Sequence, residues 1–329
     1  MTYSRSPESP NRKLKKIELP KEIKIFFAQR GKFLRGLPSY EQIEGKDPEN
    51  HDDAFDWTYG YGLPLVETRA VNNKNSDIYA QSQRRAKDLA KVLFGVSNSE
   101  IAEPLREYML TGGTKPIKVT TTVQEKERKV YVKMPSVERI VGLTLYNMIS
   151  GNEPIDFVFS EYVFAENSVS GIHIDKTNIS YMQRLKELGR SIIRARVIDN
   201  FLGINDLDRE VNLREKPEML ANLLVQSDGQ IKLFDVDCAF TRPFPEYNLV
   251  EIARKKEITI TEKDEIDIEK DEAKRINHII NTTSKRTYRK FIEAIAKIES
   301  LRKQFKKIGF KTPEDYFDEK ERWLNSKIK

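Results

Sequence analysis

Three oxygen-bearing side chains flank a predicted β-hairpin near the middle of the chain. Asn222 stands directly before an apolar strand, a Ser-Asp-Gly turn follows at 227–229, and Asp235 and Asp237 close the second apolar strand. Amide and carboxylate oxygens suit a hard cation such as Mg²⁺, which often accompanies nucleotide phosphates. Asp235 and Asp237 share one face of a strand. We therefore predict a metal site made by Asn222 and Asp237, with Asp235 as a further candidate ligand.

The elements that would position this hairpin follow from hydrophobic periodicity. Ser136 has the chemistry of an N-cap, and Gly151 that of a C-terminal stop, for the helix between them. The pattern predicts strands at 116–123, 129–134, 157–165 and 171–174, the last two as a pair, and helices at 76–94, 99–110, 136–149 and 180–202.

The order of these parts resembles the kinase-like fold over about residues 110–240. Two short motifs carry the resemblance: VYVKM at 130–134 is similar to the V-A-I-K strand, and VDCAF at 236–240 is similar to the D-F-G segment, with Cys238 and Ala239 in place of Phe and Gly. The layout looks closest to bacterial effector kinases of the Legionella type and to the phosphoinositide-kinase branch.

The resemblance implies a phosphate-orienting role for Lys133, whose ammonium would reach the α- and β-phosphates of a nucleotide. Lys118 and Lys129 are the alternatives on the same pair of strands. Glu138 would be the carboxylate that holds Lys133. A second interpretation of Glu138 is an acid favoured near a helix N-terminus by the helix dipole.

The remaining parts of a nucleotide site are implied in the same way. Gly112 and Gly113, in the turn TGGT, would cover the phosphates of ATP. Asn222 and Asp237 would hold Mg²⁺ or Mn²⁺. Catalysis would then come from positioning and charge neutralisation.

The predicted catalytic loop is FLGINDLDRE at 201–210, with Asp206 as the base that accepts the substrate hydroxyl proton and Asp208 as the alternative. Sixteen positions separate Asp206 from Asn222, which is more than the family has between its base and its metal asparagine. An insertion at about 209–220 is therefore implied, and it either needs a partner to order it or is a surface loop.

The chain is basic, with a net charge of +6, and charged residues make up 33% of its 329 residues. Such a balance favours acidic partners. Residues 262–272 hold seven acids and two lysines, which predicts a solvated face or loop, whereas 285–311 hold ten basic residues and two acids. A polyanion such as an inositol polyphosphate or a phosphoinositide head group is the expected ligand of one basic set, with a solvated helix face as the alternative: Lys285, Arg286, Arg289, Lys290, Arg302, Lys303, Lys306 and Lys307.

A single cysteine, Cys238, allows no disulfide within the chain, which fits a reducing compartment. No signal-peptide pattern and no apolar run of transmembrane length occur. These features predict a soluble protein, and the resemblance implies delivery into a host cell cytoplasm without a cleaved signal peptide, with membranes as a peripheral location.

The expected fold class is α+β, a two-lobed protein-kinase-like fold with a small β-rich N-lobe and a mostly helical C-lobe. The expected parts are a basic arm at 1–50, an N-lobe with a helical insertion at 51–172 and a C-lobe at 173–329. The implied function is an ATP- and Mg²⁺-dependent Ser/Thr protein kinase that a host polyanion activates. A phosphoinositide kinase and an inactive kinase-like module that binds phosphoinositides are the alternatives, and nucleic acid is not an expected partner.

Overall fold

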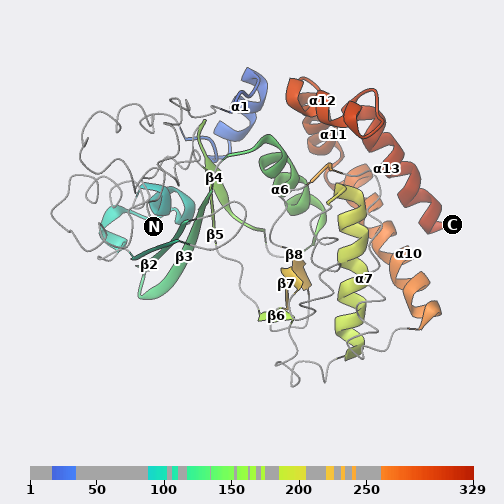
Figure 1. Cartoon of the computed structure of the whole chain (residues 1–329), viewed down its shortest axis with the longest axis horizontal. Helices are drawn as coiled ribbons and strands as arrows, with labels where there is room; N and C mark the ends of the chain where they lie inside the picture. Colours follow the sequence, from blue (N-terminus) through green and yellow to red (C-terminus); the bar gives the residue numbers. More distant parts are fainter. Residues whose placement is uncertain are drawn as a thin grey trace, which may run out of the picture. The chain divides into compact units, whose positions relative to one another are not determined.

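The computed structural model is an α+β structure (Figure 1). It describes residues 17–34, 88–101, 106–109, 117–133, 135–151, 154–161, 164–167, 172–174, 185–204, 220–225, 231–233, 239–241 and 261–329. Contacts divide the chain into two compact units. Unit 1 comprises Met1–Glu18, Ala28–Pro135 and Phe157–Asn167, and unit 2 comprises Leu19–Phe27, Ser136–Asp156 and Ser168–Lys329.

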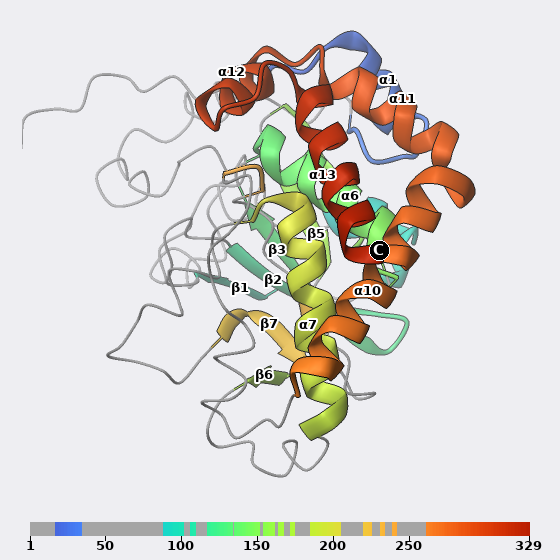
Figure 2. The same cartoon turned by 90° about the vertical axis from the view of Figure 1, so that its right-hand side faces the viewer.

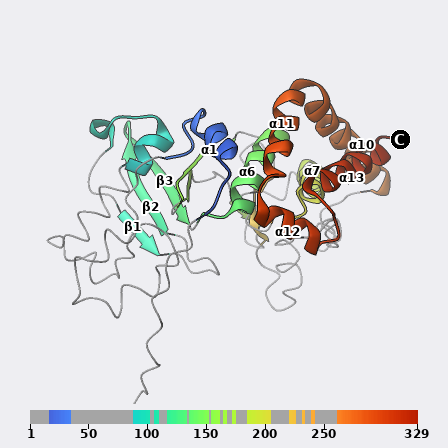
Figure 3. The same cartoon turned by 90° about the horizontal axis from the view of Figure 1, so that it is seen from above.

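Within its described residues, unit 1 contains a five-stranded antiparallel sheet of order β1-β2-β3-β5-β4. Its strands are β1 (Arg106–Met109), β2 (Ile117–Val123), β3 (Lys126–Lys133), β4 (Phe157–Phe159) and β5 (Phe164–Asn167). Figure 3 shows β1, β2 and β3 side by side. The predicted helix at 99–110 is wrong at its end, because Arg106–Met109 pair with β2 as an edge strand.

Strands β2 and β3 confirm the predicted strand pair, with a tighter turn than expected. Val123 pairs with Lys126, so only Gln124 and Glu125 form the loop. Both have positive φ, 49° and 65°, which is the type I′ geometry that matches the twist of a hairpin. Neither residue is the Asn or Gly that this turn favours, so the backbone of both residues is strained.

The β4 edge of the sheet is extended by the segment that follows the first helix. Leu34 donates its backbone N–H to the Phe159 carbonyl at 2.7 Å, and Phe159 donates to Lys32 at 2.8 Å. The Phe33 and Phe159 rings meet edge to face at 5.5 Å. A strand edge with unpaired backbone groups is thereby covered.

Unit 2 is mostly helical. Its helices are α1 (Lys21–Ala28, shared with unit 1 at its last residue), α6 (Val137–Ile149), α7 (Leu185–Leu202), α10 (Glu262–His278), α11 (Lys285–Ile295), α12 (Glu299–Lys307) and α13 (Pro313–Ile328), with a π-helical segment η4 at Ile279–Thr283. Helices α7, α10 and α13 lie side by side (Figures 1 and 2). The predicted helices at 136–149 and 180–202 are confirmed over their described parts.

Helix α6 begins and ends where the sequence predicts. The Ser136 hydroxyl accepts the Arg139 N–H at 3.0 Å, which satisfies one orphan donor of the first turn. Gly151 follows the C-cap with φ of 70°, the left-handed geometry that favours glycine there. A Cβ at this glycine would lie 2.8 Å from Nη1 of Arg275, whose guanidinium donates to the Ile149 carbonyl. The end of α6 is therefore closed by α10.

The acidic run at 262–272 is not a loop, which corrects one interpretation of the sequence. Thr261 caps α10, and its hydroxyl accepts the Asp264 N–H at 3.0 Å. Glu272 is buried, 4% exposed, and pairs with Arg275. Only part of the acidic face is solvated, because Glu265 and Glu269 pair with Arg196 of α7.

A second sheet in unit 2 contains β6 (Ile172–Ile174), β7 (Leu220–Val225) and β8 (Ile231–Leu233), in the order β6-β7-β8. Strand β6 pairs with β7. The expected pairing of this strand with the one at 157–165 is therefore wrong. The latter segment instead folds back on itself as the β4–β5 pair. Its apolar run FVFSEYVFA is interrupted by polar residues at Ser160 and Glu161, where the chain turns.

The core of unit 2 is aromatic. Tyr316 and Phe317 of α13 meet at 5.1 Å, and both lie against Phe240 at 6.0 Å. Phe201 and Phe305 bring α7 and α12 into the same cluster. All five residues are fully buried, and rings in edge-to-face contact stabilise a core beyond their buried area.

Candidate functional site

Lys133 is the predicted site residue whose environment the structure describes most fully. It is the last residue of β3, and only 5% of the residue is exposed. Its ammonium lies 2.7 Å from Oε1 of Glu166 on β5, whose side chain is also buried. Burial of a lysine and a glutamate is uncommon unless the two are paired, and here they form a pair inside the sheet.

The register explains why these two side chains meet. Tyr131 lies opposite Glu166, and Lys133 lies opposite Phe164. Lys133 and Glu166 are therefore diagonal neighbours on one face of the sheet, within reach of a long side chain. The rings of Phe157 and Phe164 stack on this face at 5.5 Å, so the ion pair has an apolar surround.

Glu166 was not among the predicted site residues, although the sequence contains a signal for it. The acid directly follows the apolar run FVFSEYVFA at 157–165, and strand alternation places it on the same face as Phe164. The predicted partner of Lys133, Glu138, lies in the first turn of α6 and belongs to unit 2. The pairing of Lys133 with Glu138 stays a prediction.

The two alternatives to Lys133 lie in different surroundings. Lys129 is on β3, its side chain is 40% exposed, and it pairs with Glu127 at 3.1 Å. Lys118 lies on β2, where its backbone pairs with Tyr131. An exposed pair such as Lys129 with Glu127 contributes little to stability, so it makes a suitable control position.

The predicted metal hairpin is present as a backbone feature. Strands β7 and β8 pair antiparallel, with Leu223 opposite Leu233 and Val225 opposite Ile231. Asn222 lies within β7. Asp235 and Asp237, like Asp206, Asp208, Gly112 and Gly113, lie outside the described residues. Among the residues that the structure describes, no group of three or more His, Cys, Asp or Glu side chains is arranged to hold a metal ion.

The end of α7 meets the segment that follows Asp237. Phe240 donates its N–H to the Leu202 carbonyl at 2.9 Å, and Thr241 donates to Gly203 at 3.1 Å. Asp206 comes two positions after Ile204, and Asp237 two positions before Ala239. These two hydrogen bonds therefore join the stretches of chain that lead into the predicted base and out of the predicted metal ligand.

Phe240 has an unusual backbone at this junction. Its φ is 62°, which for a bulky residue is a genuine outlier. The ring is fully buried in the aromatic cluster, and the Phe240 carbonyl accepts Nε2 of Gln304 at 3.0 Å. Strained residues persist where surrounding contacts over-determine them, and such residues cluster at functional sites.

Helix α13 holds the same end of α7 from another side. The buried Lys320 ammonium donates to the Asn200 carbonyl, and the Tyr316 hydroxyl donates to the Phe201 carbonyl at 3.3 Å. The last carbonyls of a helix have no partner within the helix. Here α13 supplies two donors for this turn.

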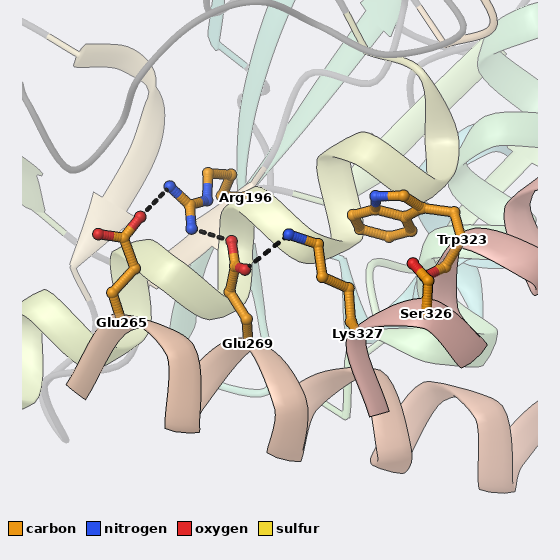
Figure 4. Close-up of polar contacts among 6 residues, drawn as sticks. All are labelled: Arg196, Glu265, Glu269, Trp323, Ser326 and Lys327. Carbon is orange, nitrogen blue, oxygen red and sulfur yellow. Dashed lines mark hydrogen bonds and ion pairs between the residues drawn. The ribbon is translucent and has the colours of Figure 1, made fainter. Parts of the chain in front are cut away.

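A polar network joins α7, α10 and α13 before the last turn of α7 (Figure 4). Arg196 donates to Glu265 at 2.7 Å and to Glu269, and Lys327 of α13 reaches the other Glu269 oxygen at 2.9 Å. The Lys327 ammonium also lies 6.0 Å from the Trp323 ring centroid. Helices α7 and α13 contribute one cation each and α10 contributes two carboxylates, so the network ties α7, α10 and α13 together.

The predicted polyanion residues fall into two groups. Arg289 is engaged with α13, 2.6 Å from Glu321 and 3.8 Å from Asp318, and Lys303 pairs with Glu299 at 2.7 Å. The other members are exposed and make no ion pair within the part of the chain that the structure describes: Lys285, Arg286, Lys290, Arg302, Lys306 and Lys307.

Comparison with protein-family models and with curated proteins gives no significant match for this chain. Within the described residues, none of the helices combines the length and the apolar character that crossing a bilayer would need.

Proposed function

We propose that the protein is an ATP- and Mg²⁺-dependent phosphotransferase that acts on Ser/Thr hydroxyl groups of a protein substrate. Lys133 orients the phosphates, Asn222 and Asp237 hold the metal, and Asp206 accepts the hydroxyl proton. Rate enhancement in such a reaction comes mostly from positioning and electrostatic stabilisation.

The single observation that carries the proposal is the buried Lys133–Glu166 pair. Removing two charges from water costs several kcal/mol per ion, about as much as their attraction returns, so a buried ion pair is weak evidence for a stabilising role. A functional role explains the pair better, because a carboxylate on the neighbouring strand holds the lysine ammonium in a fixed position. Clusters of this kind occur at functional sites, and a polyphosphate is the ligand that a fixed ammonium suits.

The order of elements is a second support. Strand β3 ends in Lys133, α6 follows, β4 and β5 return to the sheet, and the long α7 precedes the β7–β8 hairpin. The hydrogen bonds from Phe240 and Thr241 to the end of α7 support a common site for Asp206 and Asp237. Both carboxylates would then lie on stretches of chain that are hydrogen-bonded to each other close by.

A polyanion is the proposed activator, and the exposed residues of α12 are the observation that favours it. Arg302, Lys306 and Lys307 lie on the exposed surface of α12, whose Leu301 and Phe305 are buried. Several exposed cations on one helix surface suit clustered phosphates. The same face supports a phosphoinositide kinase as the second candidate, and an inactive phosphoinositide-binding module as the third. The proposed setting is the cytoplasm of a host cell.

The test is transfer of labelled phosphate from ATP, with and without host-cell extract, by the wild type and by Asp237→Ala. The proposal predicts labelling of protein that needs Mg²⁺ and is lost in Asp237→Ala. Labelling of lipids alone would move the assignment to the phosphoinositide kinase. Transfer that persists at the wild-type rate in a folded Asp237→Ala protein rejects the metal assignment, and no transfer under any condition favours the inactive module.

A further inference from the structure

A fully buried carboxylic acid lies in the last turn of α7. Among the residues that the structure describes, neither oxygen of the Asp199 side chain finds a hydrogen-bond partner, although the residue is 0% exposed. Buried polar groups are nearly always hydrogen-bonded, so an exception of this kind calls for an explanation. Burial raises the pKa of Asp199 well above its ordinary value, and the nearby Lys320 charge opposes this only in part.

The group that faces Asp199 from α13 is also buried. Lys320 is 0% exposed and donates to the carbonyl of Asn200, the residue after Asp199. Burial lowers the pKa of Lys320 to about 7, against the raising effect of the Asp199 and Glu319 charges. Burial thus favours the neutral form of both the acid and the amine.

Among the described residues, the titratable groups that act on the pair include two tyrosines and Glu319. Tyr316 of α13 donates to the Phe201 carbonyl, and burial raises its pKa well above the ordinary value, as do Asp199 and Tyr288 of α11. Tyr316 therefore stays a hydrogen-bond donor through the neutral range. Within the described residues, the charges that raise the pKa of Lys320 are those of Asp199 on α7 and Glu319 on its own helix.

We propose that Asp199 and Lys320 are a proton-linked positioning pair, which fixes the end of α7 on α13 and thereby the start of the loop that carries Asp206. This inference rests on the proposed function, because Asp206 matters only if it is the base. The geometry supports this role. Lys320 bonds the carbonyl of Asn200, the residue after Asp199. The Phe240 and Thr241 amides donate to Leu202 and Gly203, two and three positions after Asn200.

The two groups have opposite effects on how opening of this contact depends on pH. Opening exposes Lys320 and restores its ordinary pKa of 10.5, so the open form holds one more proton between pH 7 and that value. Opening by this route becomes about tenfold easier for each unit that the pH falls in that window. Exposed Asp199 loses a proton that the buried acid keeps, so its effect makes opening easier as the pH rises above its ordinary value of 3.8.

The experiment is amide hydrogen exchange followed at three N–H groups: those of Phe240 and Thr241, which donate across this junction, and that of Ile204, which donates to the Asp199 carbonyl. Rates are corrected for intrinsic exchange and measured where they report the opening equilibrium. In Asp199→Asn only the lysine titrates, and we expect protection to rise up to about tenfold per pH unit from 7 to 9. In Lys320→Met only the acid titrates, and we expect protection to fall as the pH rises from 5 to 7.

Lys327→Met, on the same helix, is the matched control and should keep the wild-type pH profile at these amides. Equal pH slopes in Asp199→Asn and Lys320→Met overturn the proposal. Should either variant fail to fold, ¹³C-labelled lysine in the wild type decides: a Lys320 titration midpoint near 7 supports the pair, and a midpoint above 9 overturns it.

The positioning role has its own readout in the transfer assay. In Asp199→Asn we expect kcat to follow the same pH dependence as amide protection, with KM for ATP unchanged, and a kcat profile identical to that of the wild type overturns the role. Exchange needs no catalysis. A wild type that transfers no phosphate would reject the proposed function while the exchange slopes still decide the proton linkage.

Discussion

Lys133 and Glu166 meet at 2.7 Å across the β3–β5 pair, and both side chains are almost wholly excluded from water. The two residues are thirty-three positions apart in the chain. Their contact is made by strand register and not by local sequence.

This pair predicts that removing one of its charges costs more stability than removing both. Glu166→Gln removes the negative charge beside a buried ammonium and should lower the free energy of unfolding by about 3 kcal/mol. The double variant Lys133→Met with Glu166→Leu replaces both charges by apolar side chains and should return to within about 1 kcal/mol of the wild type. Denaturant unfolding measures both values. A double variant less stable than Glu166→Gln would contradict this expectation.

The β2–β3 turn can be relieved of strain. Glu125 has φ of 65°, which costs a non-glycine residue about 1–2 kcal/mol. Glu125→Gly should therefore raise the free energy of unfolding by about 1 kcal/mol. Gln124 should be kept, because its Nε2 bonds Glu100 at 3.0 Å. Thermal unfolding of Glu125→Gly beside Glu125→Ala, which keeps the strain, gives the comparison, and equal melting temperatures would argue against a type I′ turn.

The C-terminal stop of α6 is a close contact with α10. Gly151→Ala would place a Cβ 2.8 Å from Nη1 of Arg275 at a φ of 70°. We expect a loss of about 2–3 kcal/mol in unfolding free energy, from left-handed strain and the displaced guanidinium. Gly95→Ala has a similar φ of 65° with no atom within 4 Å, so it isolates the strain alone. A loss no larger than that of Gly95→Ala would show that Arg275 moves aside freely.

Arg196 is the cation that two acids of α10 share. Its side chain is 12% exposed, and Glu265 and Glu269 are 22% and 14% exposed. Arg196→Met should cost about 2 kcal/mol of unfolding free energy, because two carboxylates lose the cation between them. Arg322→Met is a control, since its pair with Glu319 is surface-exposed and contributes little. A cost as small as that of Arg322→Met would mean that the network in Figure 4 is not a structural tie.

Local features of the fold could be predicted from the sequence, because short-range chemistry determines them. Ser136 and Gly151 bound α6 as expected, and the strands around Gln124 pair as expected. The β7–β8 hairpin also follows from two apolar runs around a turn. In each case the signal and the structure lie within a few residues of each other.

The remaining features depend on partners far along the chain. The strand at Arg106–Met109 is too short to show a period, and its pairing with β2 decides its state. The sequence predicts that the acids of 262–272 are solvated, because nothing nearby in the chain shows that the fold places Arg196 and Arg275 beside them. Asp199 and Lys320 carry no local sign of their burial, since they are 121 positions apart and come near each other only where Lys320 of α13 bonds the Asn200 carbonyl of α7.

Binding of Mg²⁺-ATP, measured by titration calorimetry on the wild type, Lys133→Met and Lys129→Met, tests the central proposal most directly. We expect Mg²⁺-dependent binding by the wild type, unchanged affinity in Lys129→Met and at least a tenfold weaker affinity in Lys133→Met. Equal affinity in all three proteins, or no binding by the wild type even with an added inositol polyphosphate, would contradict a nucleotide site at Lys133.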